Sequence, residues 1–117
     1  MKTVTFQLIG KYIDQIKSSS KVAEYRLIAE YNTKRLCYLS DKKDLKSDEM
    51  YVTHEKEIWR IKKDLTQVQF FNGYRKGRKE LICELKAIDI KDNPEGDTPG
   101  VSLFVLSLGR IVSEKNF

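Results

Sequence analysis

Within the stretch SSSKVAEYR (residues 18–26), the helical period of the preceding residues ends and a strand period begins. Tyr12, Ile13 and Ile16, just before it, have helical spacing. Glu24 and Arg26 are two residues apart, so in a strand their Cβ atoms lie on one face, roughly 6.5 Å apart. Lys21 stands at the strand entry, where its amine can reach that face. We therefore predict a helix over 11–18, a strand over 21–29 and a charged cluster at their junction.

Segments on either side predict further strands. Residues 3–9 alternate, with Val4, Phe6 and Leu8 on one face. Residues 66–71, 81–90 and 101–112 are also strand-like, and the last is almost continuously apolar, as in a strand covered on both faces. Residues 30–39 have helical spacing that would turn Leu36 and Leu39 inward.

The middle of the chain is harder to assign. Residues 40–50 carry seven charged side chains and predict a loop. Ile58, Ile61 and Leu65 follow at i, i+3 and i+7, which favours an amphipathic helix over 53–65, with a strand over 57–61 as the alternative. Residues 72–80 and 91–100 read as loops, and residues 113–117 as a frayed tail.

These elements predict an α+β, mostly β fold of about five to six strands and two to three short helices. The length of 117 residues and the lack of a linker predict one domain over residues 1–117. A small β-barrel is the preferred closure, because it hides the edges of so short a sheet.

The net charge, the apolar runs and the cysteine and histidine content of the chain limit the classes of function that it can have. A net charge of +5 favours an anionic partner such as RNA or a nucleotide. No run is long enough to cross a bilayer and no signal peptide is evident, so we expect a cytoplasmic protein with no membrane association. Cys37, Cys83 and His54 are too few ligands for a zinc site, and we expect reduced thiols and neither metal nor cofactor.

The charged cluster has a candidate third member on the strand 81–90. Glu84 and Lys86 share one face of that strand. If it faces the same cleft, Glu84 joins Lys21 and Glu24 as a set suited to acid–base chemistry, and these three are the catalytic candidates. A solvated sheet face is the alternative.

A basic loop follows the strand 66–71. Arg75, Lys76, Arg78 and Lys79 are placed to contact phosphates, and Tyr74 to stack on a base. The alternative is a solvated hairpin loop.

The longer stretch YIDQIKSSSKVAEYR (12–26) resembles the signature of the ASCH domain (activating signal cointegrator homology), a PUA-like β-barrel. That signature is an apolar helix followed by G-x-K-x-x-E-x-R. Lys21, Glu24 and Arg26 take its charged positions, whereas Ser19 stands at its glycine and Val22 at a frequent threonine. The stretches YNTKRL (31–36), FFNGYRKGRKELICELKAIDI (70–90) and LSLGRIV (106–112) are similar to further parts of bacterial and phage-type members.

The resemblance implies a small barrel whose cleft, beside the K-x-x-E-x-R strand, receives RNA or a nucleotide-like ligand. Together with the basic loop it gives a set of expected ligand-binding residues. These are Lys21, Glu24, Arg26, Asn72, Tyr74, Arg75, Lys76 and Arg78.

Two alternatives remain. Small bacterial members resemble amidohydrolases that act on acetylated cytidine nucleosides, and others are linked to RNA cleavage. The chain would then be an amidohydrolase or ribonuclease using Lys21 and a glutamate, with Glu84 matched by strand position, although Val22 and Glu24 stand where those hydrolases carry hydroxyls. The second alternative is a phage-type inhibitor or adaptor that binds a protein partner through residues 40–57, for which the family offers no counterpart.

Overall fold

The computed structural model describes residues 2–19, 21–41, 43, 45–73, 76–92 and 102–117. The chain forms two compact units. Unit 1 comprises Met1–Glu24, Asp64–Ala87 and Leu106–Phe117, and unit 2 comprises Tyr25–Lys63 and Ile88–Val105. Each unit is therefore assembled from segments that are distant in sequence.

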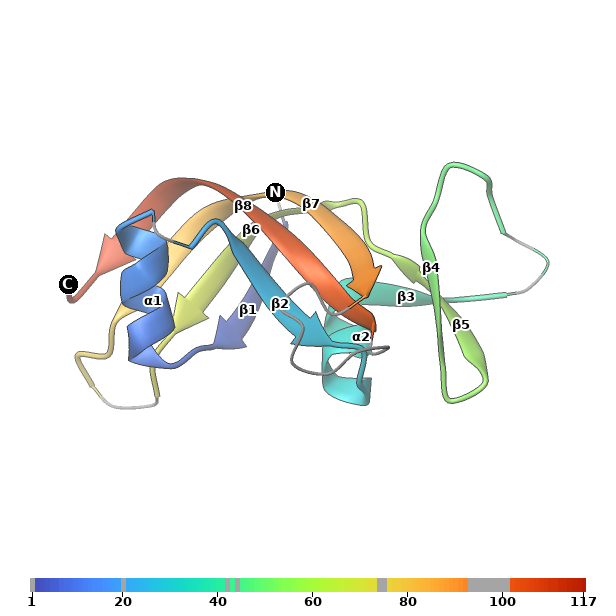
Figure 1. The fold of residues 1–117 in the computed structure, drawn as a ribbon, viewed down its shortest axis with the longest axis horizontal. Coiled ribbons are helices and arrows are strands. Elements are labelled where there is room, and N and C mark those ends of the chain that lie inside the picture. The colour runs from blue at the N-terminus through green and yellow to red at the C-terminus, as the bar shows by residue number, and fades with distance from the viewer. Residues whose placement is uncertain (1, 20, 42, 44, 74–75, 93–101) are drawn as a thin grey trace. The chain divides into compact units, whose positions relative to one another are not determined.

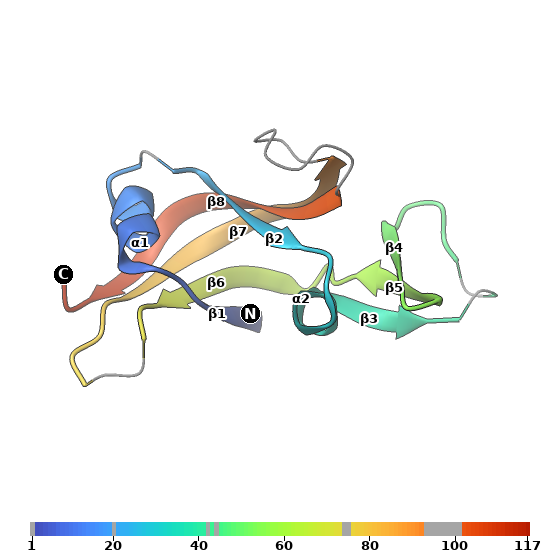
Figure 2. The same cartoon turned by 60° about the horizontal axis from the view of Figure 1, so that its bottom comes forward.

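The described residues form eight strands and two helices (Figure 1). In chain order these are β1 (Lys2–Gln7), α1 (Gly10–Lys17), β2 (Ala23–Leu27), α2 (Glu30–Leu36), β3 (Cys37–Ser40), β4 (Tyr51–His54), β5 (Glu57–Ile61), β6 (Leu65–Phe71), β7 (Glu80–Asp92) and β8 (Ser102–Lys115). Five strands form a curled sheet in the order β1-β6-β7-β8-β2 (Figure 2), and the other three form a sheet in the order β3-β5-β4. The predicted α+β, mostly β fold is confirmed, with the barrel-like sheet present as a half-barrel and with more strands than expected.

The core of unit 1 follows from the alternation of its strands. Parallel β1 and β6 place Val4 beside Val68 and Phe6 beside Phe70, and β7 continues both rows with Cys83 and Leu81. All six side chains are buried. On α1, Ile13 and Ile16 are buried as well, as their helical spacing predicts. The opposite face of the strands is polar, with Thr3 and Thr5 donating hydrogen bonds to glutamines of β6.

Helix α1 ends within the serine run, as predicted. The amide of Ser18 donates to the carbonyl of Asp14, and the amide of Ser19 donates to that of Ile16. Ser19 then has φ of 65°, a left-handed conformation that L-residues other than glycine seldom adopt. This residue turns the chain toward Lys21, whose amide donates to the carbonyl of Gln15.

The predicted helix over residues 53–65 is wrong and the alternative strand over 57–61 is confirmed as β5, because β4 and β5 form an antiparallel hairpin in unit 2. Val52 lies opposite Trp59, and His54 opposite Glu57. The two turn residues, Glu55 and Lys56, have φ of 52° and 65°, the signs that a type I′ turn requires. Cross-strand packing of β-branched and aromatic side chains outweighs the helical spacing of the isoleucines.

Two smaller expectations also fail. Leu39, expected to pack inward from a helix, lies on β3 with 59% of its surface exposed, whereas Leu36 on α2 is buried as expected. The predicted frayed tail is largely strand, because β8 continues to Lys115. Within the described part of the chain, no helix has the length and apolar character needed to cross a membrane.

Candidate functional site

The formal charge of the chain is divided unequally between its units. Unit 1 contains 11 Lys and Arg residues and 6 Asp and Glu residues, whereas unit 2 contains 11 of each kind. The whole net charge of +5 therefore belongs to unit 1. A compact unit with this excess attracts anions over its surface, and the neutral unit does not.

Lys21 and Glu24 form a largely buried ion pair in unit 1. Lys21 Nζ lies 3.5 Å from Glu24 Oε1, and only 16% and 7% of the two side chains are exposed. The amide of Lys21 is held by the end of α1, and Glu24 is the buried residue of β2, so the turn at Ser19 brings the two together. Two charges at this depth are compatible with folding because each compensates the other.

An exposed aromatic ring lies beside this pair. Lys21 Nζ is 5.4 Å from the centroid of the Tyr12 ring, and Lys11 Nζ is 6.0 Å from it. The exposed fraction of Tyr12 is 39%. An accessible ring with two ammonium groups nearby is suited to stacking on a base while cations of the unit meet the phosphates.

The sequence prediction missed Tyr12 by grouping it with the apolar face of α1. Ile13 and Ile16 already supply the buried stripe of this short helix. A tyrosine one position outside that stripe, and between two lysines, was the signal that could have identified it.

Arg26 and Glu84 are the other predicted members of the charged cluster. Arg26 lies two residues beyond Glu24 on β2 and shares its face. Glu84 stands opposite Gln67 in the sheet, on the face turned away from the buried Cys83, and accepts a hydrogen bond from Arg110 Nε at 3.0 Å. The carboxylate of Glu84 is thus engaged by Arg110.

The residues expected from the β6–β7 loop fall into two groups. Tyr74 and Arg75 lie outside the described residues. Asn72 packs on the start of α1, where a Cβ at Gly10 would lie 2.8 Å from Asn72 Nδ2, so a larger residue at position 10 would displace this side-chain amide. The amide of Asn72 donates to the carbonyl of Lys79 and closes the loop.

Arg78 and Lys79 are held in place by acidic groups of unit 1. Arg78 Nε donates to Glu80 at 2.9 Å, and Lys79 Nζ donates to Asp14 of α1 at 2.8 Å. Lys76, by contrast, is exposed at the loop. The basic loop thus holds one arginine in a defined orientation beside a freely accessible lysine.

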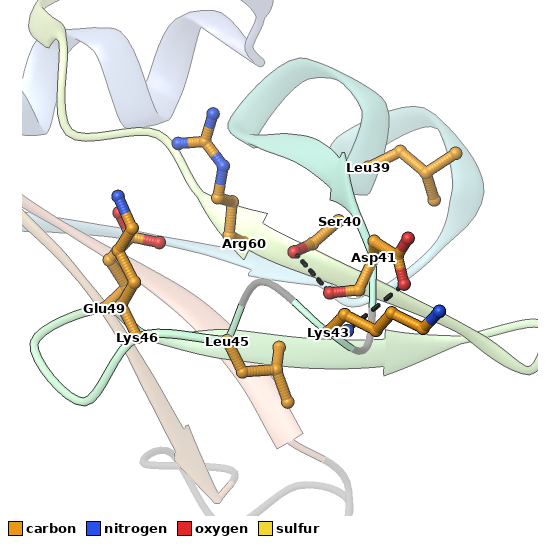
Figure 3. Close-up of a pocket in the computed structure, with 8 residues that line it drawn as sticks. All are labelled: Leu39, Ser40, Asp41, Lys43, Leu45, Lys46, Glu49 and Arg60. Atoms are coloured by element: carbon orange, nitrogen blue, oxygen red, sulfur yellow. Dashed lines mark hydrogen bonds between the residues drawn. The ribbon is translucent and has the colours of Figure 1, made fainter.

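Unit 2 contains a separate cavity of about 650 Å³, lined mainly by the segment for which the family offers no counterpart (Figure 3). Its lining residues are Leu39, Ser40, Asp41, Lys43, Leu45, Lys46, Glu49 and Arg60. The hydroxyl of Tyr51 accepts from the amide of Lys46 and donates to Glu49, which ties this segment to β4. The lining mixes cations and anions, so it has no clear preference for a charged ligand.

The two thiols have no nucleophilic role near neutral pH. Burial raises the pKa of Cys37 to about 12 and that of Cys83 to about 11, which keeps both protonated. Across the described ranges, no group of three or more His, Cys, Asp and Glu side chains is arranged to hold a metal ion.

No protein-family model, no curated protein and no solved structure matches the chain.

Proposed function

We propose that the chain is an RNA- or nucleotide-binding domain of the ASCH type. Tyr12 and the Lys21–Glu24 pair receive a base or nucleoside, and the cations of unit 1 attract the phosphates. The observation that carries this proposal is the accumulation of the entire net charge in the unit that also presents Tyr12 beside Lys21.

The conformation of Ser19 supports the resemblance to the family. The signature has a glycine at this position, and glycine adopts positive φ without steric cost. In this chain the serine keeps a φ of 65°, so a turn that glycine favours is present although the glycine is not. The departure from the signature is therefore one of residue type rather than of backbone geometry.

The proposed roles follow from the chemistry of the three side chains. The Tyr12 ring stacks on a base, a contact that tolerates any base because each has a π-face. Lys21 is oriented by Glu24 and donates to an acceptor of the ligand. Glu24 accepts from an amino or imino group. Arg26, on the same face of β2, adds a further cation to the expected set.

Hydrolase chemistry is the alternative for the same pair. Glu24 pairs with Lys21, whereas Glu84 pairs with Arg110, so an amidohydrolase or ribonuclease built on the Lys21–Glu24 pair would use Glu24 as its acid–base group. A protein-binding role would instead use unit 2, where Leu39 and Leu45 are 59% and 49% exposed.

The test measures binding of fluorescein-labelled decauridine by fluorescence anisotropy. Tyr12→Leu should weaken binding about 5- to 160-fold, because base–aromatic stacking contributes about 1–3 kcal/mol per base. Tyr31→Leu is the matched control, since Tyr31 is an exposed ring of unit 2 that lies against Arg35. Equal weakening by both variants, or no binding by the wild-type chain, would contradict the proposal. Cleavage of the RNA would favour the hydrolase alternative.

A further inference from the structure

A second basic pocket lies in unit 1, where the β6–β7 loop meets the end of β8. Its volume is about 440 Å³. The lining residues are Lys76, Gly77, Arg78, Glu80, Lys115 and Asn116. Lys115 and Asn116 belong to residues 113–117, which the sequence predicts to be a frayed tail. The pocket forms because β8 extends to Lys115.

Arg78 is fixed in this pocket by three contacts. Its Nε donates to Glu80 Oε1 at 2.9 Å, and its Nη1 donates to the carbonyl of Gly73 at 3.2 Å. The guanidinium also lies over the ring of Phe71, 4.3 Å from its centroid. A guanidinium held in this way loses little conformational entropy when its remaining N–H groups bind an anion.

The main chain of the pocket is fixed as well. Asn116 Nδ2 donates to the carbonyl of Arg78 at 2.6 Å, which ties the loop to the end of β8. This hydrogen bond holds the segments that carry Lys76 and Lys115 next to one another.

The positive charge of the pocket exceeds its negative charge. Within the described residues, Lys76 and Lys115 form no ion pair, and both are exposed. The single carboxylate of the lining, Glu80, is already engaged by Arg78. Two ammonium groups and one oriented guanidinium thus line the pocket together with a single carboxylate, which leaves an excess of two positive charges.

We propose that this pocket binds a phosphate group. Phosphate matches it better than a carboxylate does, because its several oxygens can accept from an arginine fork and from two ammonium groups together. The inference rests on the proposed function in that the phosphate belongs to the same ligand, and it adds Lys115 to the binding residues. The phosphate is either a backbone diester of RNA or the terminal group of a nucleotide.

The first experiment titrates the ¹⁵N-labelled chain with inorganic phosphate, uridine monophosphate and uridine at constant ionic strength. Phosphate and the monophosphate should cause saturable shifts of the amides of residues 76–78 and 115–116, and uridine should not. The double variant Lys76→Ala/Lys115→Ala should abolish these shifts. The matched control is Lys56→Ala/Lys91→Ala, which removes the same charge from exposed lysines of unit 2. If phosphate causes no such shifts, or if the control variant loses them equally, phosphate binding in this pocket is contradicted.

The second experiment measures decauridine affinity against salt concentration. If the pocket holds a backbone phosphate, the Lys76→Ala/Lys115→Ala slope should be shallower than wild type by about 1.4, since two contacts are lost at about 0.7 each for single strands. If phosphate shifts these amides but the double variant has the same salt slope as wild type, the result would support phosphate binding in the pocket. It would also assign the pocket to the terminal phosphate of a nucleotide.

The two proposals fail in distinguishable ways. In one case RNA binding depends on Tyr12 but not on Lys76 and Lys115, and phosphate causes no shifts. The proposed function then stands, and phosphate binding in the pocket is rejected. Phosphate shifts at residues 76–78 without binding of RNA or uridine monophosphate at Tyr12 keep the pocket and reject the proposed function.

Discussion

Glu24 is a carboxylate with 7% of its side chain exposed, and the ammonium of Lys21 lies 3.5 Å from it. Removing the lysine leaves a buried charge without that compensation, which typically costs about 3–5 kcal/mol. Lys21→Met should therefore lower the free energy of unfolding by about 3 kcal/mol in urea titrations. Adding Glu24→Gln should recover most of the loss, because the buried charge is then gone.

The double-mutant cycle of these two changes measures their coupling. A loss below about 0.5 kcal/mol in Lys21→Met alone would contradict a buried pair, because exposed ion pairs contribute that little.

Ser19 allows a prediction about backbone strain. A residue with a side chain loses about 1–2 kcal/mol in the left-handed region, whereas glycine does not, although glycine is more flexible when unfolded. Ser19→Gly should therefore raise the free energy of unfolding by about 0.5 kcal/mol or more, and Ser19→Ala should not. A Ser19→Gly variant less stable than wild type would contradict the φ of 65°.

The buried thiols predict a loss of stability at alkaline pH. Burial raises the pKa of Cys37 from 9.0 to about 12, so the unfolded thiol ionises above pH 9 while the folded one stays protonated. The contribution of this group is complete below pH 9 and decreases above it, by about 1.4 kcal/mol per pH unit. Between pH 9 and 10.5, Cys37→Ala should thus lose stability less steeply than wild type. Parallel slopes would contradict the prediction, since the remaining titrating groups are shared.

At the scale of elements, the segments with a clear period were predictable. The alternation of Val4 and Phe6 gave β1, and the spacing of Ile13 and Ile16 gave α1, because burial of one face determines both patterns. The hairpin β4–β5 was not predictable in this way. Its turn uses Glu55 and Lys56 in place of the Asn-Gly pair that marks type I′ turns, so the local signal was missing.

This unusual turn gives a prediction for unit 2. Two residues with side chains occupy left-handed positions, so Glu55→Asn/Lys56→Gly should raise the free energy of unfolding by about 1 kcal/mol. Glu55→Ala/Lys56→Ala is the control, because it removes the same two charges and keeps a Cβ at both strained positions. Urea unfolding measures the difference. A destabilised Asn-Gly variant would show that the chain does not form this turn.

At the scale of the whole molecule, the net charge could be read from the sequence, but its location could not. Unit 1 gathers three separate segments, and unit 2 the two segments between them. Along the chain, the cations therefore look evenly spread, and only the fold reveals that one unit holds all of the excess. The same applies to Lys115, which joins Lys76 in one pocket although 39 positions separate them in the sequence.

The proposal that basic unit 1 binds RNA or nucleotides is best tested by the salt dependence of decauridine binding by the wild-type chain. Four candidate phosphate contacts lie in unit 1: Lys11, beside the Tyr12 ring, and Lys76, Arg78 and Lys115 of the second pocket. Four contacts on a single strand correspond to a slope of about −2.8 in log affinity against log salt, or about a 50-fold loss between 50 and 200 mM. We expect a loss of this size. An affinity that stays unchanged over this range, or no measurable binding at 50 mM, would contradict a basic unit that binds RNA or nucleotides.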